Sequence, residues 1–285
     1  MKPRRYLLTI SCPDTVGIVA GVSGFLAQNK GWIVEASYHS DPEAQSFFMR
    51  NEVLADSLPF GVDELRTRFE EVANKFKMTW KISDTQVKKR VVVLVSKEDH
   101  CLSDILHRWR NNELDFDFRA VISNHETLRG FVEWHGVPFH YIPVDKNNKQ
   151  AAFALTDEFV NRENPDTIVL ARYMQILPPN MCERYEGRVI NIHHSFLPSF
   201  AGAKPYHQAY ERGVKLIGAT SHFATAELDA GPIIEQDVIR IDHAHSPEDM
   251  IRLGRDVEKT VLARALRYHL EDRILIHGQK TVVFK

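Results

Sequence analysis

Three polar residues near the ends of expected strands have side chains suited to carbonyl chemistry. Asn191 and His193 lie two residues apart in an apolar run, so on a strand their side chains face the same side. An amide donor beside an imidazole can stabilise a developing oxyanion. Asp229 lies in a turn bounded by glycine and proline, where its carboxylate can act as a base or keep His193 charged. This set, without a nucleophilic serine or cysteine, predicts attack of water on a carbonyl, although polar strand ends and turn aspartates are also common structural features.

The second part of the chain has the β-α rhythm that would position these residues. Val91–Val95 is a continuous apolar run, typical of a strand buried on both faces. This alternation predicts an α/β domain with a doubly wound, mostly parallel sheet, whose ligands bind beyond the carboxyl ends of the strands. Further strands are expected at 117–123, 139–144, 167–172 and 189–194, and helices at 102–113, 127–135, 149–163 and 178–186.

The end of the chain departs from this alternation. Strand-like runs at 216–225 and 232–241 are joined by the short turn that carries Asp229. Ser246 is expected to cap a long helix that runs to about residue 271, and residues 280–284 are expected to form a short final strand.

The first part of the chain predicts a different unit. Strands are expected at 5–12, 32–40, 46–55 and 78–83, with one helix that begins near Thr15, is capped by Asp14 and ends at Gly31, and a second at 63–76. The order β-α-β-β-α-β is that of the ferredoxin-like unit. We therefore expect a first domain at 1–84, a polar linker at 85–90 and a second domain at 91–285.

Composition limits the functional classes. The 285 residues carry 36 Lys and Arg against 38 Asp and Glu, a net charge of −2 that disfavours a nucleic-acid partner. Three distant cysteines offer no CxxC pair or disulfide ladder, which fits a reducing cytosol. No run approaches the roughly 18 apolar residues of a membrane span. We expect a soluble, cytoplasmic protein without a membrane partner.

The motifs around the polar trio resemble those of the formyltransferases that use 10-formyltetrahydrofolate. Asn191-Ile192-His193 with Ser195 and Leu197-Pro198 is similar to their N-I-H-x-S-x-L-P signature, and Ser221–Phe223 with Glu227–Pro232 to a second one. The resemblance covers about residues 88–285 and places Asn191, His193 and Asp229 on catalytic positions. It implies a Rossmann-like formyltransferase domain whose folate-binding residues are Met174, Gln175, Ile176, Leu177, His222, Thr225, Ala226 and Glu227.

Residues 5–84 resemble the ACT domain, a small module that binds amino acids, through Cys12–Val19 at the first strand-to-helix turn. An ACT-like domain ahead of a formyltransferase-like domain makes the whole chain similar to the formyltetrahydrofolate deformylase family. The resemblance implies a homo-oligomer, dimer or tetramer, with glycine or methionine as a possible effector, or a first domain that only mediates oligomerisation. The expected effector-binding residues are Asp14, Val16, Gly17 and Ile18.

The same resemblance implies a hydrolase that converts 10-formyltetrahydrofolate and water to formate and tetrahydrofolate, feeds formate to purine synthesis and balances the one-carbon folate pool. Asn191 and protonated His193 would hold the formyl oxyanion while Asp229 activates water. No cofactor is expected. No metal is expected either, because His193-His194 and His243-Ala244-His245 fit no ligand spacing.

The loop Ser96–Cys101 favours water as the formyl acceptor. It lacks glycine and carries Glu98 and Asp99, whereas the glycinamide ribonucleotide enzymes have a Gly- and Asn-rich phosphate loop there. The net charge also opposes a tRNA acceptor. Two alternatives stay open: a formyltransferase with a small amine acceptor, like the glycinamide ribonucleotide enzymes, and a folate sensor without turnover.

Overall fold

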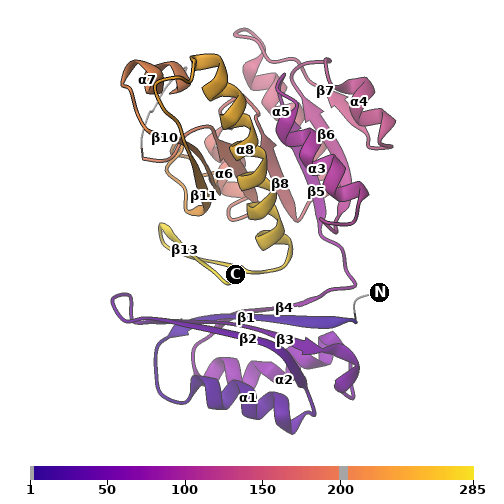
Figure 1. Ribbon diagram of the computed structural model, residues 1–285. Coiled ribbons are helices and arrows are strands. Elements are labelled where there is room, and N and C mark those ends of the chain that lie inside the picture. Colours follow the sequence, from indigo (N-terminus) through magenta and orange to yellow (C-terminus); the bar gives the residue numbers. More distant parts are fainter. Residues whose placement is uncertain (1–2, 199–204) are drawn as a thin grey trace. The chain divides into compact units, whose positions relative to one another are not determined.

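The computed structural model describes residues 3–198 and 205–285, which divide into two compact units (Figure 1). The first contains the described residues up to Lys88 together with 271–277 and 282–285, and the second contains those between Lys89 and Leu270 together with 278–281. The sequence-based division placed all of 271–285 in the second domain, whereas the contacts of most of these residues are with the first unit.

The first unit confirms the expected β-α-β-β-α-β order. Among the described residues its strands form one antiparallel sheet in the order β2-β3-β1-β4. The elements are β1 (Arg5–Pro13), α1 (Ile18–Gln28), β2 (Trp32–Asp41), β3 (Ser46–Leu54), the 3-10 turn η1 (Ala55–Ser57), α2 (Val62–Lys75) and β4 (Thr79–Asp84).

The start of α1 differs from the prediction. The helix begins at Ile18 rather than near Thr15, and the residue before it is Gly17 in a left-handed conformation, with φ +97°. Asp14 does not cap the helix; its carboxylate instead accepts a hydrogen bond from the Ser40 hydroxyl. The helix thus starts after a left-handed glycine and has no side-chain cap, because glycine adopts a positive φ at little cost.

The two faces of the first sheet are covered differently. Alternate residues of β1 and β3 pack with α1 and α2 in one apolar core. On the other face Phe48 packs with Leu275 and Phe284 of the chain end, whose strands are β12 (Ile274–His277) and β13 (Lys280–Val283). Arg50, with a side chain 1% exposed, bonds to Glu52 at 2.6 Å and donates to the carbonyl oxygens of residues 271 and 272. The prediction contained β13 but not β12.

The second unit confirms the doubly wound sheet. Its described strands lie in the order β11-β10-β9-β8-β5-β6-β7. The five strands from β9 to β7 are parallel to one another, whereas β10 pairs antiparallel with both of its neighbours, β9 and β11. The strands are β5 (Arg90–Val95), β6 (Asp117–Ser123), β7 (Phe139–Tyr141), β8 (Thr167–Ala171), β9 (Val189–His193), β10 (Leu216–Phe223) and β11 (Ile233–Arg240). The helices are α3 (His100–Arg110), α4 (Arg129–Trp134), α5 (Lys149–Glu163), α6 (Pro179–Arg184), α7 (Pro205–Glu211) and α8 (Pro247–Leu270).

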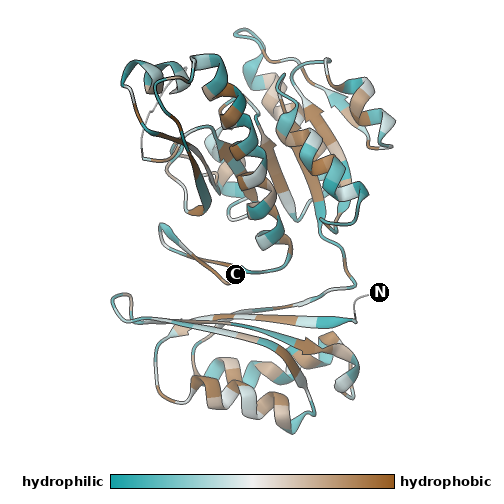
Figure 2. Cartoon of the chain, in the orientation of Figure 1, coloured by the Kyte–Doolittle hydropathy of each residue, from teal (hydrophilic) through white to brown (hydrophobic). Residues whose placement is uncertain are grey.

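Helices cover this sheet on both faces, and its strands are the most apolar elements of the second unit (Figure 2). Side chains of α5 and α6 share one apolar cluster with alternate residues of β5 and β8. Helices α3 and α8 contact each other, and α8 also packs on β9, β10 and β11. Ser246 caps α8 as expected, because its Oγ accepts the N–H of Asp249 at 3.1 Å.

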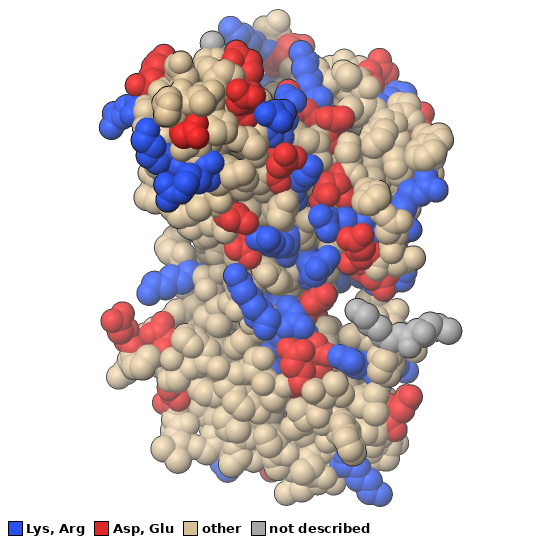
Figure 3. Space-filling model, viewed as in Figure 1, with Lys and Arg blue, Asp and Glu red and all other residues tan. Residues whose placement is uncertain are grey.

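Surface charge is mixed. On the face shown in Figure 3, acidic and basic side chains are interspersed. None of the described helices is long and apolar enough to cross a membrane.

Candidate active site

The structure brings the predicted polar trio together at the carboxyl edge of the second sheet. Asn191 and His193 lie on β9 and share the face of Val189, as their spacing predicted. Asp229 lies in the turn between β10 and β11, and its Oδ2 is 3.2 Å from Nδ1 of His193. The side chain of His193 is 9% exposed and that of Asp229 26% exposed, so the pair is largely shielded but open to a small molecule.

The turn that carries Asp229 is shaped by its backbone. Asp229 has φ +55°, in the left-handed region that aspartate tolerates better than most residues. A Cβ at Gly231 would lie 1.8 Å from the carbonyl oxygen of Phe223. The N–H of Phe223 also donates to the carbonyl of Pro232. The glycine therefore permits the close chain crossing that points the carboxylate at β9.

Asp229 is held as a carboxylate. The hydrogen bond with His193 is the main cause, and the nearby His222 the second, that keeps the pKa of Asp229 well below its usual range and outweighs the effect of burial. A carboxylate of this kind is a weak base but a strong partner for an imidazolium ion.

His222 connects the amide to the carboxylate. Its Nδ1 donates to the carbonyl of Phe223 at 2.9 Å, so Nε2 of the neutral ring can accept a hydrogen bond. Asn191 Nδ2 lies 3.1 Å from that Nε2, and Asp229 Oδ1 lies 3.5 Å from it. The bond fixes the Asn191 amide and leaves its second N–H for a ligand. Because His222 is 2% exposed, it lies behind the site.

Ser195 is a site residue that the sequence reasoning missed. Its Oγ lies 2.8 Å from Nε2 of His193, so both ring nitrogens have partners. The available signal was its place two residues after His193, within the motif itself. A Ser-His-Asp chain of this kind also occurs in hydrolases with a serine nucleophile. Ser195 is only 5% exposed, which favours a role in orienting the imidazole.

The two expected folate segments approach each other. Leu177 is buried in the apolar cluster against which Ala224 packs, just before Thr225. Met174 and Ile176 are more than half exposed, which leaves apolar surface for a ligand. Gln175 is half-buried, Ala226 and Glu227 are exposed, and the Thr225 hydroxyl donates to the carbonyl of Glu227.

A pocket of about 800 Å³ adjoins the first of these segments. Its apolar walls include Phe153, Ile176 and Leu177, and Lys149, Gln150 and Asn180 contribute polar groups. Such a volume suits a drug-sized ligand with an aromatic body and a polar tail.

The expected effector residues lie in the first unit, at the turn between β1 and α1. Val16 is 98% exposed, whereas Ile18 is 2% exposed and belongs to the core. The backbone N–H of Asp14 donates to the carbonyl of Gln45, so that N–H is already engaged.

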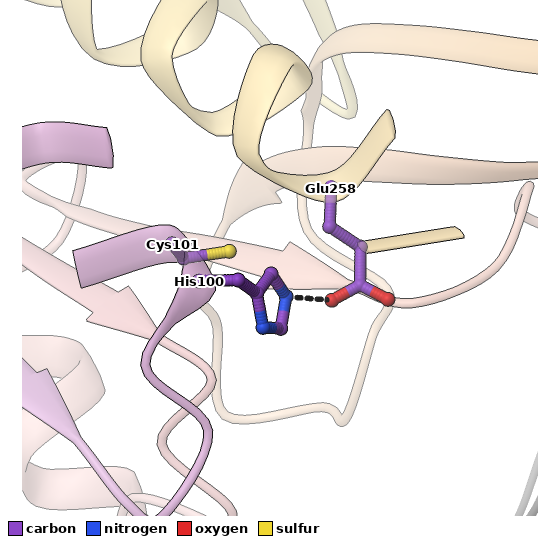
Figure 4. Close-up of side chains that lie close together, drawn as sticks. All are labelled: His100, Cys101 and Glu258. Atoms are coloured by element: carbon purple, nitrogen blue, oxygen red, sulfur yellow. Dashed lines mark hydrogen bonds and ion pairs between the residues drawn. The ribbon is translucent and has the colours of Figure 1, made fainter. Parts of the chain in front are cut away.

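Within the described part of the chain, one group of side chains has metal-ligand geometry. Ligand atoms of His100, Cys101 and Glu258 lie within 4.8 Å of one another (Figure 4). The Nε of Arg172, however, is 3.4 Å from the same Glu258 oxygen that His100 contacts. Burial, with Glu258 nearby, raises the pKa of the Cys101 thiol well above its usual value, and metals bind the thiolate. The group therefore favours a guanidinium over a metal ion.

Known proteins resemble the chain over its full length. A family model described as Formyl transferase matches residues 89–266. Formyltetrahydrofolate deformylase from Corynebacterium sp. (strain P-1) is 45% identical over 281 residues, which cover 99% of this chain and 98% of that protein. The crystal structure of a formyltetrahydrofolate deformylase from Pseudomonas syringae pv. tomato superimposes with a TM-score of 0.98 at 60% identity, over 100% of this chain and 96% of that one.

A second group of neighbours shares part of the chain. Glycinamide ribonucleotide transformylase 1 from Symbiobacterium toebii superimposes with a TM-score of 0.65 at 30% identity, over 70% of this chain and 95% of that one. The deformylases named above cover nearly the whole chain, whereas this transformylase covers 70% of it. The trio at the sheet edge, the two-unit architecture and the full-length identity agree: the chain belongs to the formyltetrahydrofolate deformylase family.

Proposed function

We propose that this protein hydrolyses 10-formyltetrahydrofolate to formate and tetrahydrofolate. The observation that carries the proposal is the pairing of His193 with Asp229 beside Asn191, in a chain whose full-length relatives are named deformylases. A pterin would insert between Met174–Leu177 and Thr225–Glu227. The aromatic and glutamate portions would extend towards the pocket near Lys149.

The amide, imidazole and carboxylate of the trio together support a mechanism in which water attacks the formyl carbon directly. The free N–H of Asn191 donates to the formyl oxygen as it becomes an oxyanion, and the positive charge of the His193 imidazolium, whose ring nitrogens face Asp229 and Ser195, stabilises the same oxyanion. Asp229 orients the water and balances the imidazolium charge. Of the two roles open to Asp229, its low pKa favours charge balance over simple base catalysis.

The proton balance follows from the pair acting as one acid–base unit. Water adds its oxygen to the formyl carbon, and one of its protons passes to the Asp229 carboxylate, the member of the pair that can accept it while His193 stays an imidazolium. The tetrahedral intermediate then breaks its bond between carbon and N10 as N10 takes that proton, so Asp229 holds it only in passing. Tetrahydrofolate and formic acid leave, and the acid loses its remaining proton to solvent as formate. Each step uses only water, substrate and these side chains, so the hydrolysis requires no cofactor or metal.

The first unit suggests regulation. We propose that the turn at Asp14–Ile18, which is exposed up to Gly17, binds glycine or methionine within a cytoplasmic homo-oligomer, a dimer or a tetramer. The carboxylate of Asp14 and the left-handed Gly17 backbone offer complementary groups to an amino acid. Activity should change when either amino acid is added at millimolar concentration; an unaltered rate with both would leave only the oligomerisation role.

The test of the main proposal is the stoichiometry of turnover without an acceptor. Purified protein and 10-formyltetrahydrofolate in plain buffer should yield formate and tetrahydrofolate in equal amounts. Binding without product would support a folate sensor instead. Product that forms only after an amine is added would support a transferase.

A further inference from the structure

A buried polar cluster lies near the catalytic trio, centred on Glu258 of α8. The Glu258 carboxylate is 1% exposed and bonds to Nε2 of His100 and to the hydroxyl of Tyr206, each at 2.7 Å. The Nε of Arg172 lies 3.4 Å from it. We call these four residues the Glu258 cluster. Figure 4 shows His100 and Glu258 turned toward each other from α3 and α8.

The cluster is close to His193. His194 follows His193 on the chain, and its ring centroid is 5.2 Å from that of His193 and 6.5 Å from that of Tyr206. Burial, strengthened by the charge of Arg172, lowers the pKa of His194 to about 4, so this ring is neutral at physiological pH. The charge of Glu258 is thus separated from the catalytic imidazole by two aromatic side chains.

The cluster also lies on the sheet face opposite the expected folate site. Leu177 packs with α5, α6 and Val189, and Asn191 and His193 share the face of Val189. His194 follows the end of β9, and its ring lies between that of His193 and that of Tyr206 in the Glu258 cluster, whose His100 and Glu258 belong to α3 and α8. A formyl group held by the trio would therefore have the expected folate site on one side and the Glu258 cluster on the other.

Arg172 occupies its place at a conformational cost. It directly follows β8 with φ +61°, a left-handed conformation that glycine adopts freely and arginine rarely. Among the described residues its Nε and Nη1 have no hydrogen-bond partner, although both atoms are buried. Strained backbone and unsatisfied donors persist where they serve a function.

Tyr206 is tightly packed against α8. A Cβ at Gly254 of α8 would lie 2.1 Å from the Tyr206 hydroxyl, so the ring occupies a space that only glycine leaves open.

The loop after β5 is also occupied by side chains of this chain. Nearer the surface, Glu98 of this loop pairs with Arg255 of α8 at 2.5 Å. That loop and the start of α3 are where a doubly wound sheet would bind an acceptor phosphate. The chain's own side chains thus occupy this position.

From this arrangement we infer that the Glu258 cluster, and Arg172 in particular, fills the space that an amine acceptor of the formyl group would occupy, leaving room only for water. The inference rests on the proposed hydrolysis. The comparison with a transformylase supports it, because that protein superimposes on 70% of this chain at 30% identity and is named for glycinamide ribonucleotide. Arg172 is then the specificity-determining residue.

Transfer of the formyl group to an amine, the reaction that the cluster would prevent, needs no reactant besides the amine and 10-formyltetrahydrofolate. An amine nitrogen would bond to the formyl carbon, the bond from that carbon to N10 would break, and N10 would take the proton that the amine loses. The products would be an N-formyl amine and tetrahydrofolate. In the unaltered protein the Arg172 guanidinium lies beside Glu258, 3.4 Å from its Oε2, so the space next to this carboxylate is already filled.

The test measures how the Arg172→Gly variant divides the formyl group between water and an added amine, with glycinamide as the probe. Glycine removes the backbone strain, opens the space and frees Glu258. We expect the ratio of N-formylglycinamide to formate to rise at least about tenfold over the unaltered protein. Tyr206→Ala, which opens the same space from α7, should raise the ratio too. Arg172→Lys retains a cation there and should keep the original ratio.

Lys30→Gly is the matched control, because it removes a basic residue with φ +64° from the first unit and should leave the ratio unchanged. Unaltered protein that formylates glycinamide as readily as Arg172→Gly would overturn the inference. So would folded, hydrolytically active Arg172→Gly or Tyr206→Ala that forms no N-formylglycinamide. Failure of the proposed function is distinguishable, since the unaltered protein would then release no formate in the absence of glycinamide.

Discussion

Replacement of Asn191 by alanine tests the oxyanion site. The change removes the amide that lies 3.1 Å from Nε2 of His222 and whose second N–H is free for the formyl oxygen. Loss of one such donor typically lowers kcat by about 10²–10³, equivalent to about 2.7–4 kcal/mol of transition-state stabilisation. The free amide makes this contact only when the oxyanion forms, so folate affinity should change little.

The same substitution should affect stability far less than rate. It removes one side-chain hydrogen bond, worth about 1 kcal/mol. His222 keeps its bond to the carbonyl of Phe223, so the ring stays anchored. For a protein of this size we expect Tm to fall by about 2–4 °C. A large loss of kcat with a small change in Tm would separate catalysis from folding.

The assay measures formate release under saturating 10-formyltetrahydrofolate, with KM and a thermal melt for each variant. Asn111→Ala provides the control. It deletes another asparagine–histidine contact, with Nδ2 3.0 Å from Nε2 of His107, at the far end of α3. It should keep full activity. An Asn191→Ala variant with near-normal kcat would remove this amide from the mechanism.

Three further predictions concern the groups around the trio and the chain end. Ser195→Ala should retain turnover within about tenfold if the hydroxyl only orients the imidazole; complete loss with an intact fold would indicate a nucleophile instead. Gly231→Ala should lower activity at least about tenfold because its Cβ would meet a backbone oxygen at 1.8 Å, whereas Gly130→Ala, with nothing within 4 Å, should be neutral in the same assay. Deleting residues 271–285 should destabilise the first unit by about 3 kcal/mol or more, because Arg50 loses charged hydrogen bonds to two carbonyl groups; an unchanged urea midpoint for that unit would contradict this.

Periodicity explains why much of the fold could be predicted. The apolar run of β5 and the alternation along β9 have strong periods, and the latter also placed Asn191 and His193 on one face. The short helix α7 was not predicted, and Asp14 was wrongly expected to cap α1. At that turn the left-handed Gly17 decides where the helix starts, and local propensity does not reveal such a conformation.

The site could be predicted in part for a related reason. The approach of Asp229 to His193 depends on the antiparallel pairing of β10 with both β9 and β11 and on the close crossing at Gly231. The resemblance to a family supplied that proximity, and the spacing of the residues did not. The contacts of His222 and the whole Glu258 cluster join segments far apart in sequence, so no local pattern could reveal them.

The most direct test of the central claim is formate release by Asp229→Asn beside the unaltered protein, without added acceptor. The substitution keeps the shape but removes the charge that pairs with His193. Because hydrogen bonds hold the pKa of Asp229 well below its usual range, its carboxylate persists as pH falls to its ordinary pKa of about 3.9. The account therefore predicts formate from the unaltered protein and a loss of at least about 10³-fold in the variant, at pH 6 as well as at pH 8. Comparable release by both proteins would contradict it.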